Sequence, residues 1–327
     1  MNHRKLGKTG LSVSEISLGT WQVGGKWGEP FSHANADQIL NAAIDAGINF
    51  IDTADVYGDG ESEKAVGRLV RSRSERIFVA TKCGRRLQPH TADAYQPAAL
   101  RQFVEDSLRN MQLETLDLIQ LHCPPTDVYY RPEIFELFDR LRDEGKIQHL
   151  GVSIEKVEEG LKAIEFPNVT TVQLIFNMFR QRPPELLFKE AARRDIGLIV
   201  RVPLASGLLT GKFSPQSTFA PDDHRNFNRH GEAFDKGETF SGVDYATGLA
   251  AVEELKQAFP NQPLADIALR WILMFDEVSC VIPGASRPEQ ILQNLKAAEL
   301  PPLSAEQMQA VRKIYDERIR PLVHYSW

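Results

Sequence analysis

The sequence predicts an α/β fold, a (β/α)8 TIM barrel with an N-terminal β-hairpin and an extra C-terminal helix. Eight short apolar segments are each followed by helical spacing, which is the repeat of such a barrel. The segments are continuously apolar, as expected for a parallel sheet that is buried on both faces. The alternative, an open doubly wound sheet, usually carries a glycine-rich fingerprint after its first strand. Here that strand leads into Gly19-Thr20-Trp21, which favours the barrel.

The elements follow in regular order. A hairpin is predicted over residues 4–15, with Gly7 and Gly10 around its turn. Ser62 is a candidate N-cap, and Pro97 suits a first helical turn. The predicted strands span residues 16–19, 49–52, 77–80, 116–121, 147–152, 172–175, 198–202 and 278–282. The predicted helices span residues 37–46, 62–70, 97–110, 132–142, 157–164, 185–194, 245–259, 264–274, 288–298 and 304–318.

Composition narrows the function classes. The 327 residues, 42% of them hydrophobic, are expected to form one domain over 1–327, and a net charge of -6 argues against a nucleic-acid surface. No run of 18 apolar residues predicts a membrane span, and the N-terminus lacks the apolar core of a signal peptide. Cys83, Cys123 and Cys280 are odd in number and far apart, so we expect a cytoplasmic protein without a disulfide framework. No metal-ligand spacing occurs, and no metal site is expected.

Four residues near the ends of successive strands indicate chemistry. The carboxyl ends of barrel strands meet at one mouth, where active sites lie. Asp52, Lys82 and His122 end the second, third and fourth strands, and Tyr57 follows Asp52 in its loop. Singly, Asp52 is also explained as a cap, Lys82 as a solvent-reaching lysine and His122 as a core histidine. Together they offer an acid, a base, a phenol and an imidazole on neighbouring strands.

This set suits proton transfer to a carbonyl oxygen. Lowering the pKa of a tyrosine from ~10 to ~7 takes roughly 4 kcal/mol. An ammonium group about 4 Å away supplies about that much at an effective dielectric constant of ~20. We therefore expect Lys82 to lower the pKa of Tyr57, Asp52 to hold Lys82, and His122 to orient the substrate carbonyl. No side chain supplies a hydride, so a cofactor must.

With these residues the chain resembles the aldo-keto reductase superfamily. The resemblance runs over most of the chain, through the motifs RKLGKTGLSVSEISLGTWQ, DTADVYGDGESE, ATKCG, LDLIQLHCP, EGKIQHLGVS, VQLIFN, PLASGLLTGK and IPGASRPEQILQNLKA. It implies the catalytic tetrad Asp52, Tyr57, Lys82 and His122. It also implies NADP(H) bound in extended form across the mouth, with NAD(H) as the alternative.

The resemblance assigns residues to each part of the cofactor. Ser153 and Gln173 are implied for the nicotinamide carboxamide. Residues implied for the pyrophosphate are Pro203, Leu204, Gly207, Leu209 and Lys212. Those implied for the adenosine end are Gly284, Ser286, Arg287, Gln290, Gln293 and Asn294, with help from Arg225. The helix amides after Ser286 suit a 2′-phosphate.

Two positions depart from the family pattern. Ile154 replaces an asparagine that holds the carboxamide, and Arg201 replaces an aromatic residue that stacks on the nicotinamide. The planar guanidinium of Arg201 either stacks there or faces an anionic substrate. Trp21 and Trp27 are predicted substrate contacts, with a core role as the other explanation for Trp21.

The predicted function is an NADP(H)-dependent oxidoreductase that reduces aldehydes or ketones, or oxidises sugars or alcohols in reverse. The alternative is a non-enzymatic cofactor-binding partner, because potassium-channel β-subunits resemble the same superfamily. The chain starts at the hairpin without an N-terminal extension, which favours the enzyme. A small carbonyl or sugar is the expected partner, with neither nucleic acid nor membrane, and the sequence predicts no oligomeric state.

Overall fold

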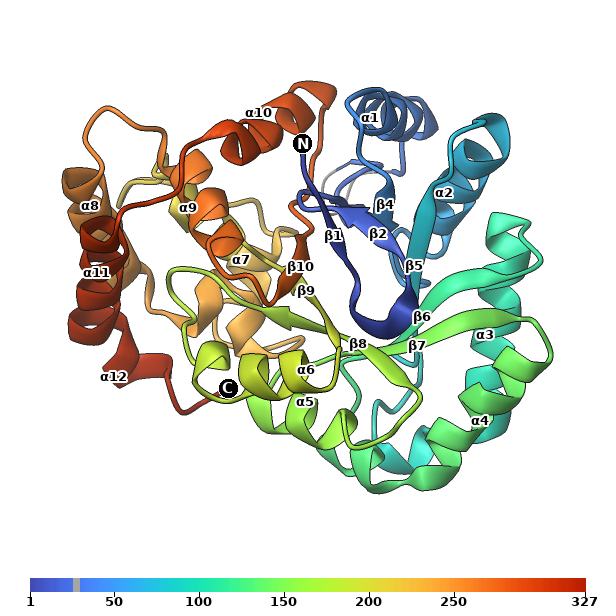
Figure 1. Ribbon diagram of the computed structural model, residues 1–327. Helices are drawn as coiled ribbons and strands as arrows, with labels where there is room; N and C mark the ends of the chain where they lie inside the picture. Colours follow the sequence, from blue (N-terminus) through green and yellow to red (C-terminus); the bar gives the residue numbers. More distant parts are fainter. Residues whose placement is uncertain (26–29) are drawn as a thin grey trace.

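The computed structural model describes residues 1–25 and 30–327, so the predicted contact Trp27 lies outside the described residues. Its centre is an eight-stranded parallel sheet, seen in Figure 1 inside a ring of helices. The strands are β3 (Leu18–Gly19), β4 (Phe50–Asp52), β5 (Phe78–Cys83), β6 (Leu116–His122), β7 (Ile147–Ser153), β8 (Val169–Ile175), β9 (Gly197–Arg201) and β10 (Val278–Val281). Each strand pairs with the next, and bridges Ile16–Val281 and Gly19–Gly284 close the barrel. The predicted (β/α)8 fold is therefore confirmed.

A hairpin of β1 (His3–Lys5) and β2 (Ser12–Ser14) crosses one end of the barrel (Figure 1). Leu6 and Val13 are fully buried and belong to the same apolar cluster as the barrel residues Phe50, Ala80 and Leu118. The hairpin therefore closes the barrel at the N-terminal ends of the barrel strands, opposite the predicted site.

Helices surround the strands, and a large apolar cluster fills the layer between them. They are α1 (His33–Asp45), α2 (Glu61–Ser72), α3 (Pro97–Met111), α4 (Pro132–Asp143), α5 (Val157–Ala163), α6 (Leu187–Arg193), α7 (His224–Phe227), α8 (Tyr245–Ala258), α9 (Leu264–Leu273), α10 (Pro288–Glu299), α11 (Ala305–Ile314) and α12 (Arg320–Val323). The predicted extra C-terminal helix is α11, which continues through a π-helical segment (Tyr315–Ile319) into α12. No described helix has both the length and the apolar character needed to cross a bilayer.

The N-terminal caps of α1 and α2 differ from the predictions. Helix α1 begins at His33 rather than at residue 37, because the Ser32 side chain accepts the Asn35 amide and caps it. The prediction of Ser62 as an N-cap is wrong, since Gly60 at φ 84° holds that position. A left-handed glycine lets the turn enter the helix directly. The Ser62 hydroxyl instead donates to Thr20 Oγ1 at 2.8 Å and tethers α2 to the strand ends.

The long segment after β9 is anchored over the barrel mouth. The ring of His224 in α7 lies 4.9 Å from that of Trp21, centroid to centroid. Further along, Asp235 accepts a 2.6 Å hydrogen bond from the indole nitrogen of Trp327. The Trp327 ring in turn lies 4.2 Å from the guanidinium carbon of Arg180, so the C-terminal residue holds this segment against the barrel.

Candidate active site

The four predicted catalytic side chains meet at the carboxyl ends of β4, β5 and β6. Lys82 Nζ donates to Asp52 Oδ1 at 2.5 Å and to the Thr53 carbonyl at 2.8 Å. Its third partner is the Tyr57 hydroxyl, at 3.3 Å. The His122 ring lies edge-on to that of Tyr57, with 6.1 Å between centroids. The structure therefore brings the tetrad together around the Lys82 ammonium group.

Strand alternation explains this placement. Phe50, Ala80 and Leu118 share the apolar cluster inside the barrel, so the residues two positions later point the same way, one layer higher. Those residues are Asp52, Lys82 and Gln120. A layer of polar side chains therefore lies directly above the apolar layer inside the barrel.

Asp52 is also held by two amides. The side-chain nitrogen atoms of Gln120 and Gln173 donate to Asp52 Oδ2 at 3.0 and 2.7 Å. Both glutamines are buried. Sequence reasoning missed Gln120, although its spacing of two residues from His122 on β6 was the signal. Asp52 is thus fixed from three strands and holds the Lys82 head group in turn.

Protonation in the site differs from the expectation in one respect. Burial raises the pKa of Tyr57, and the opposing effect of Lys82 does not cancel this rise. The prediction that Lys82 brings the pKa of Tyr57 below its usual value is therefore wrong for the protein alone. For Lys82, burial favours a lower pKa, but Asp52 and Tyr57 outweigh it and raise the pKa. Tyr57 therefore keeps its proton beside a charged ammonium.

His122 is held neutral. Burial lowers its pKa well below the usual value, and the positive charges of Arg85, Lys82 and Arg201 add to the effect. Its Nδ1 atom is buried without a hydrogen-bond partner among the described residues. A neutral imidazole can donate a hydrogen bond from one ring nitrogen without delivering a charge.

A cavity of about 790 Å³ opens beside this group. The cavity extends from Tyr57 and His122 at the barrel centre to residues of α10 at the rim. One elongated ligand can therefore reach both the centre and the rim. Most predicted site residues line it: Asp52, Tyr57, His122, Trp21, Gln173, Arg201, Pro203, Leu204, Gly207, Lys212, Arg225, Gly284, Gln290, Gln293 and Asn294. Lys82 is fully buried behind Asp52 and Tyr57.

Four predicted cofactor residues are not on this wall. Ser153 is fully buried, with its hydroxyl 3.5 Å from the Cys123 sulfur. Leu209 is buried in the main apolar cluster. The Ser286 hydroxyl and amide are both bonded to a glutamine of α10, and Arg287 is exposed. Their roles toward a cofactor stay predictions.

The cavity wall fits an extended dinucleotide. Gln173 uses its amide nitrogen on Asp52, while its carbonyl oxygen is buried without a partner among the described residues. That oxygen can accept a carboxamide N–H. Gly207 has φ 96°, a conformation that glycine adopts without strain, and it is one of the residues that line the cavity. Lys296, which was not predicted, lies at the α10 end together with Asp266.

A group of paired charges adjoins His122, and of its members only Arg201 was predicted as a site residue. Arg201 Nη2 lies 3.0 Å from Glu155 Oε1, and Arg201 Nη1 lies 3.6 Å from Glu238 Oε2. Arg85 Nη1 lies 3.3 Å from the other Glu238 oxygen. These four residues come from four separate segments of the chain, so no local sequence spacing brings them together. They are called the charge cluster below.

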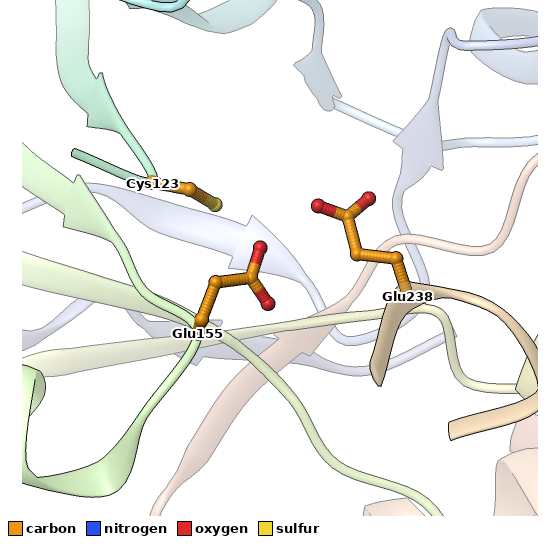
Figure 2. A group of neighbouring side chains, drawn as sticks. All are labelled: Cys123, Glu155 and Glu238. Atoms are coloured by element: carbon orange, nitrogen blue, oxygen red, sulfur yellow. The ribbon is translucent and has the colours of Figure 1, made fainter. Parts of the chain in front are cut away.

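Figure 2 shows the side chains of Cys123, Glu155 and Glu238 pointing toward one another. One possible ligand atom from each residue lies within 4.8 Å of those of the other two. The sequence predicted no metal site, and this grouping was not foreseen. Arg201 contacts all three: its Nη2 atom is 3.5 Å from the Cys123 sulfur, besides the two ion pairs. The guanidinium group of Arg201 thus places a positive charge between these three side chains, where a bound metal ion would place one.

Comparison with known proteins places the chain among relatives over most of its length. The model of the "Aldo/keto reductase family" matches residues 15–316. The uncharacterized oxidoreductase YqkF of Bacillus subtilis is 30% identical over 315 residues, which cover 95% of this chain and 96% of the relative. A relative from Schizosaccharomyces pombe, assigned by name to the voltage-gated potassium channel β-subunits, is 30% identical over 315 residues, covering 90% of this chain and 88% of the relative.

A solved structure gives the same result for the fold. The glycerol dehydrogenase AKR11B4 from Gluconobacter oxydans superposes with a TM-score of 0.76 at 28% identity. The match covers 97% of this chain and 96% of that chain. The agreement therefore extends over nearly the whole of both chains.

Proposed function

Because the chain belongs to the aldo/keto reductase family, we propose that it is an NADP(H)-dependent oxidoreductase that reduces aldehydes or ketones to alcohols, or oxidises sugars or alcohols in reverse. In this proposal the chain is one catalytic domain, residues 1–327, working in the cytoplasm on a small substrate. The observation that carries it is the contact of the buried Lys82 ammonium with the Tyr57 hydroxyl, at 3.3 Å and at the wall of a large cavity.

Each residue of the tetrad has a separate task. The bound cofactor supplies the hydride. Tyr57 gives its proton to the carbonyl oxygen as negative charge develops there, and Lys82 stabilises the phenolate that remains. Asp52 and its two glutamines keep Lys82 charged and in place. His122, being neutral, donates a hydrogen bond to the carbonyl oxygen and orients it.

We favour NADP(H) over NAD(H) from the charges at the rim of the cavity. Lys212, Arg225 and Lys296 line it, and a 2′-phosphate gains from such groups. Arg225 already pairs with Asp223 at 2.5 Å, and Asp266 lies at the same rim as Lys296. The preference for NADP(H) is therefore expected to be moderate, with NAD(H) binding more weakly.

The test combines binding with turnover. NADPH and NADH are titrated against the protein by fluorescence, and NADPH oxidation is then followed over a panel of aldehydes and ketones. Tyr57→Phe should bind NADPH as the wild type does and lose turnover by about a hundredfold or more. Tyr130→Phe is the matched control, because Tyr130 is 64% exposed and outside the cavity wall. Equal turnover in Tyr57→Phe and wild type would end the proposed mechanism.

A second candidate function is that of a cofactor-binding partner subunit. The observation favouring it is the relative assigned by name to the potassium channel β-subunits. This candidate predicts a stable complex with a membrane protein and no carbonyl turnover, while NADPH still binds. Co-purification from detergent-solubilised membranes, run beside the turnover assay, separates the two functions.

A further inference from the structure

The geometry points to a carboxylate-binding subsite formed by Arg85 and Arg201, through which the enzyme prefers carbonyl substrates that carry a carboxylate group. This inference rests on the proposed function and adds the substrate class. Both arginines line the same cavity wall as Tyr57 and His122. A substrate whose carbonyl group lies at Tyr57 therefore extends past two guanidinium groups.

The two arginines reach the cavity from different strands. Arg85 follows β5, and Arg201 is the last residue of β9. Their charges are both among the causes that lower the pKa of His122, which places them close to the reacting end of the cavity. An anionic substituent bound here would lie beside the carbonyl group rather than at the distant adenosine end.

The spacing of the arginines already accommodates a carboxylate. Glu238 places one oxygen 3.3 Å from Arg85 Nη1 and the other 3.6 Å from Arg201 Nη1. A single carboxylate thus bridges both guanidinium groups. Each guanidinium group contacts one oxygen of the same carboxylate, and such charge-assisted contacts are those that arginine makes with carboxylates.

Arg85 retains donors for a second anion. A guanidinium group has five N–H donors, but within the described residues the side chain of Arg85 hydrogen-bonds to Glu238 alone. Its side chain is 22% exposed at the cavity wall, against 11% for Arg201. Arg201 is more fully engaged by Glu155 and Glu238, so Arg85 is the residue that contacts the ligand most freely.

The net charge of the cluster favours an anion. Burial and the neighbouring Glu238 raise the pKa of Glu155, despite the opposing effect of Arg201. Although burial opposes it, Arg201 and Arg85 lower the pKa of Glu238, which therefore stays ionised. Near neutral pH the two arginines thus face one full negative charge and a carboxyl group that tends to hold its proton.

The competing explanation is that the charge cluster only fastens the segment containing Glu238 over the barrel. A fastening role changes all substrates alike, whereas a subsite changes the ratio between charged and neutral ones. The substrates are therefore para-carboxybenzaldehyde and its methyl ester, which differ mainly in charge. The readout is the ratio of their kcat/KM values, with KM and kcat determined separately.

The wild type should prefer the acid over the ester by about tenfold or more, as expected for a charge-assisted pair. Arg85→Gln should reduce this ratio by about tenfold, chiefly through KM, and Arg85→Lys should restore part of it. Arg86→Gln is the matched control: Arg86 pairs with Asp106 at 3.7 Å and does not line the cavity. A ratio near one in the wild type, or an equal ratio in Arg85→Gln and wild type, overturns the subsite.

Ligand binding tests the subsite independently of turnover. Calorimetry measures para-carboxybenzyl alcohol and its methyl ester against the wild type and Arg85→Gln, with and without NADP⁺. If neither these two aldehydes nor any carbonyl compound of the panel is turned over, the proposed function fails, while Arg85-dependent binding of the acid still supports the subsite. Binding of the acid that is no stronger than that of the ester, or that is unchanged in Arg85→Gln, refutes it.

Discussion

Lys82 Nζ lies 2.5 Å from Asp52 Oδ1, and neither side chain is more than 2% exposed. Two opposite charges buried this deeply depend on each other, because each removes the cost of desolvating its partner. Asp52 further accepts hydrogen bonds from Gln120 and Gln173, so the pair belongs to a network that spans four strands, β4, β5, β6 and β8. The pair therefore couples stability to the proposed chemistry.

Lys82→Met should lower both stability and activity. It leaves the Asp52 carboxylate buried without its cation, which costs about 3–5 kcal/mol of unfolding free energy. The kcat should fall about a hundredfold or more, because Tyr57 loses the ammonium group. Urea unfolding and single-substrate kinetics measure the two effects. The double variant Asp52→Asn/Lys82→Met should regain part of the stability but none of the activity; a double variant no more stable than the single one contradicts the coupling.

Asp55→Asn should stabilise the protein above neutral pH. Asp55 is fully buried, and neither carboxyl oxygen has a hydrogen-bond partner among the described residues. Burial and the nearby Glu63 raise the pKa of Asp55 to about 7. The folded state then binds more protons than the unfolded state between about pH 4 and pH 7, so wild-type stability falls as pH rises through that range.

The increase in unfolding free energy caused by Asp55→Asn is at most about 4 kcal/mol near pH 8 and should vanish near pH 4. Urea unfolding across this range measures it. Asp127→Asn, which changes an exposed acid, serves as the control and should show no such pH dependence. If Asp55→Asn differs from the wild type by the same amount at every pH, the buried carboxyl group is not responsible.

His224→Gln should reduce the loss of unfolding free energy that occurs as the pH falls below about 6.5. Burial lowers the pKa of His224 to about 4, against an ordinary value of 6.5. Below about pH 6.5 the unfolded state binds the proton more readily, so the native state loses stability until about pH 4. The contribution is at most about 3 kcal/mol, and thermal melts over this range detect it. The exposed His230 gives the control His230→Gln; an identical acid limb in His224→Gln and wild type counts against this assignment.

Trp327→Ala should loosen the segment that carries Asp235 and Glu238. It removes the indole hydrogen bond to Asp235 and the ring over Arg180, with an expected loss of about 3 kcal/mol. Trp327→Phe keeps a ring and should lose about 1–2 kcal/mol. Amide hydrogen exchange should speed up at residues 235–242 more than at β6. Uniformly faster exchange across the molecule would instead indicate general destabilisation.

The barrel and the meeting of Asp52, Lys82 and His122 could be predicted because both follow from periodicity. Apolar runs that alternate with helices give the fold, and polar residues at successive strand ends give Asp52, Lys82 and His122. The charge cluster could not be predicted in this way. Its members are Arg85, Glu155, Arg201 and Glu238, and their contacts depend on the path of a long segment over the mouth.

Two local predictions failed for reasons that are also physical. The pKa of Tyr57 was expected from one attractive charge, but desolvation depends on everything packed around the ring and proved larger. The helix cap at Ser62 was expected from residue preference, but Gly60 in the left-handed conformation already began the helix. Both outcomes depend on the three-dimensional surroundings rather than on the residue type.

The closure of one barrel end by Leu6 and Val13 determines how a ligand enters and leaves the cavity. Because the hairpin fills one end of the barrel, a ligand reaching Tyr57 and His122 has to approach from the opposite mouth. A product must then leave through the opening by which the next substrate arrives. In the proposed reaction, a new substrate therefore cannot bind until the product has left the cavity. The rate of product release sets an upper limit on the turnover rate.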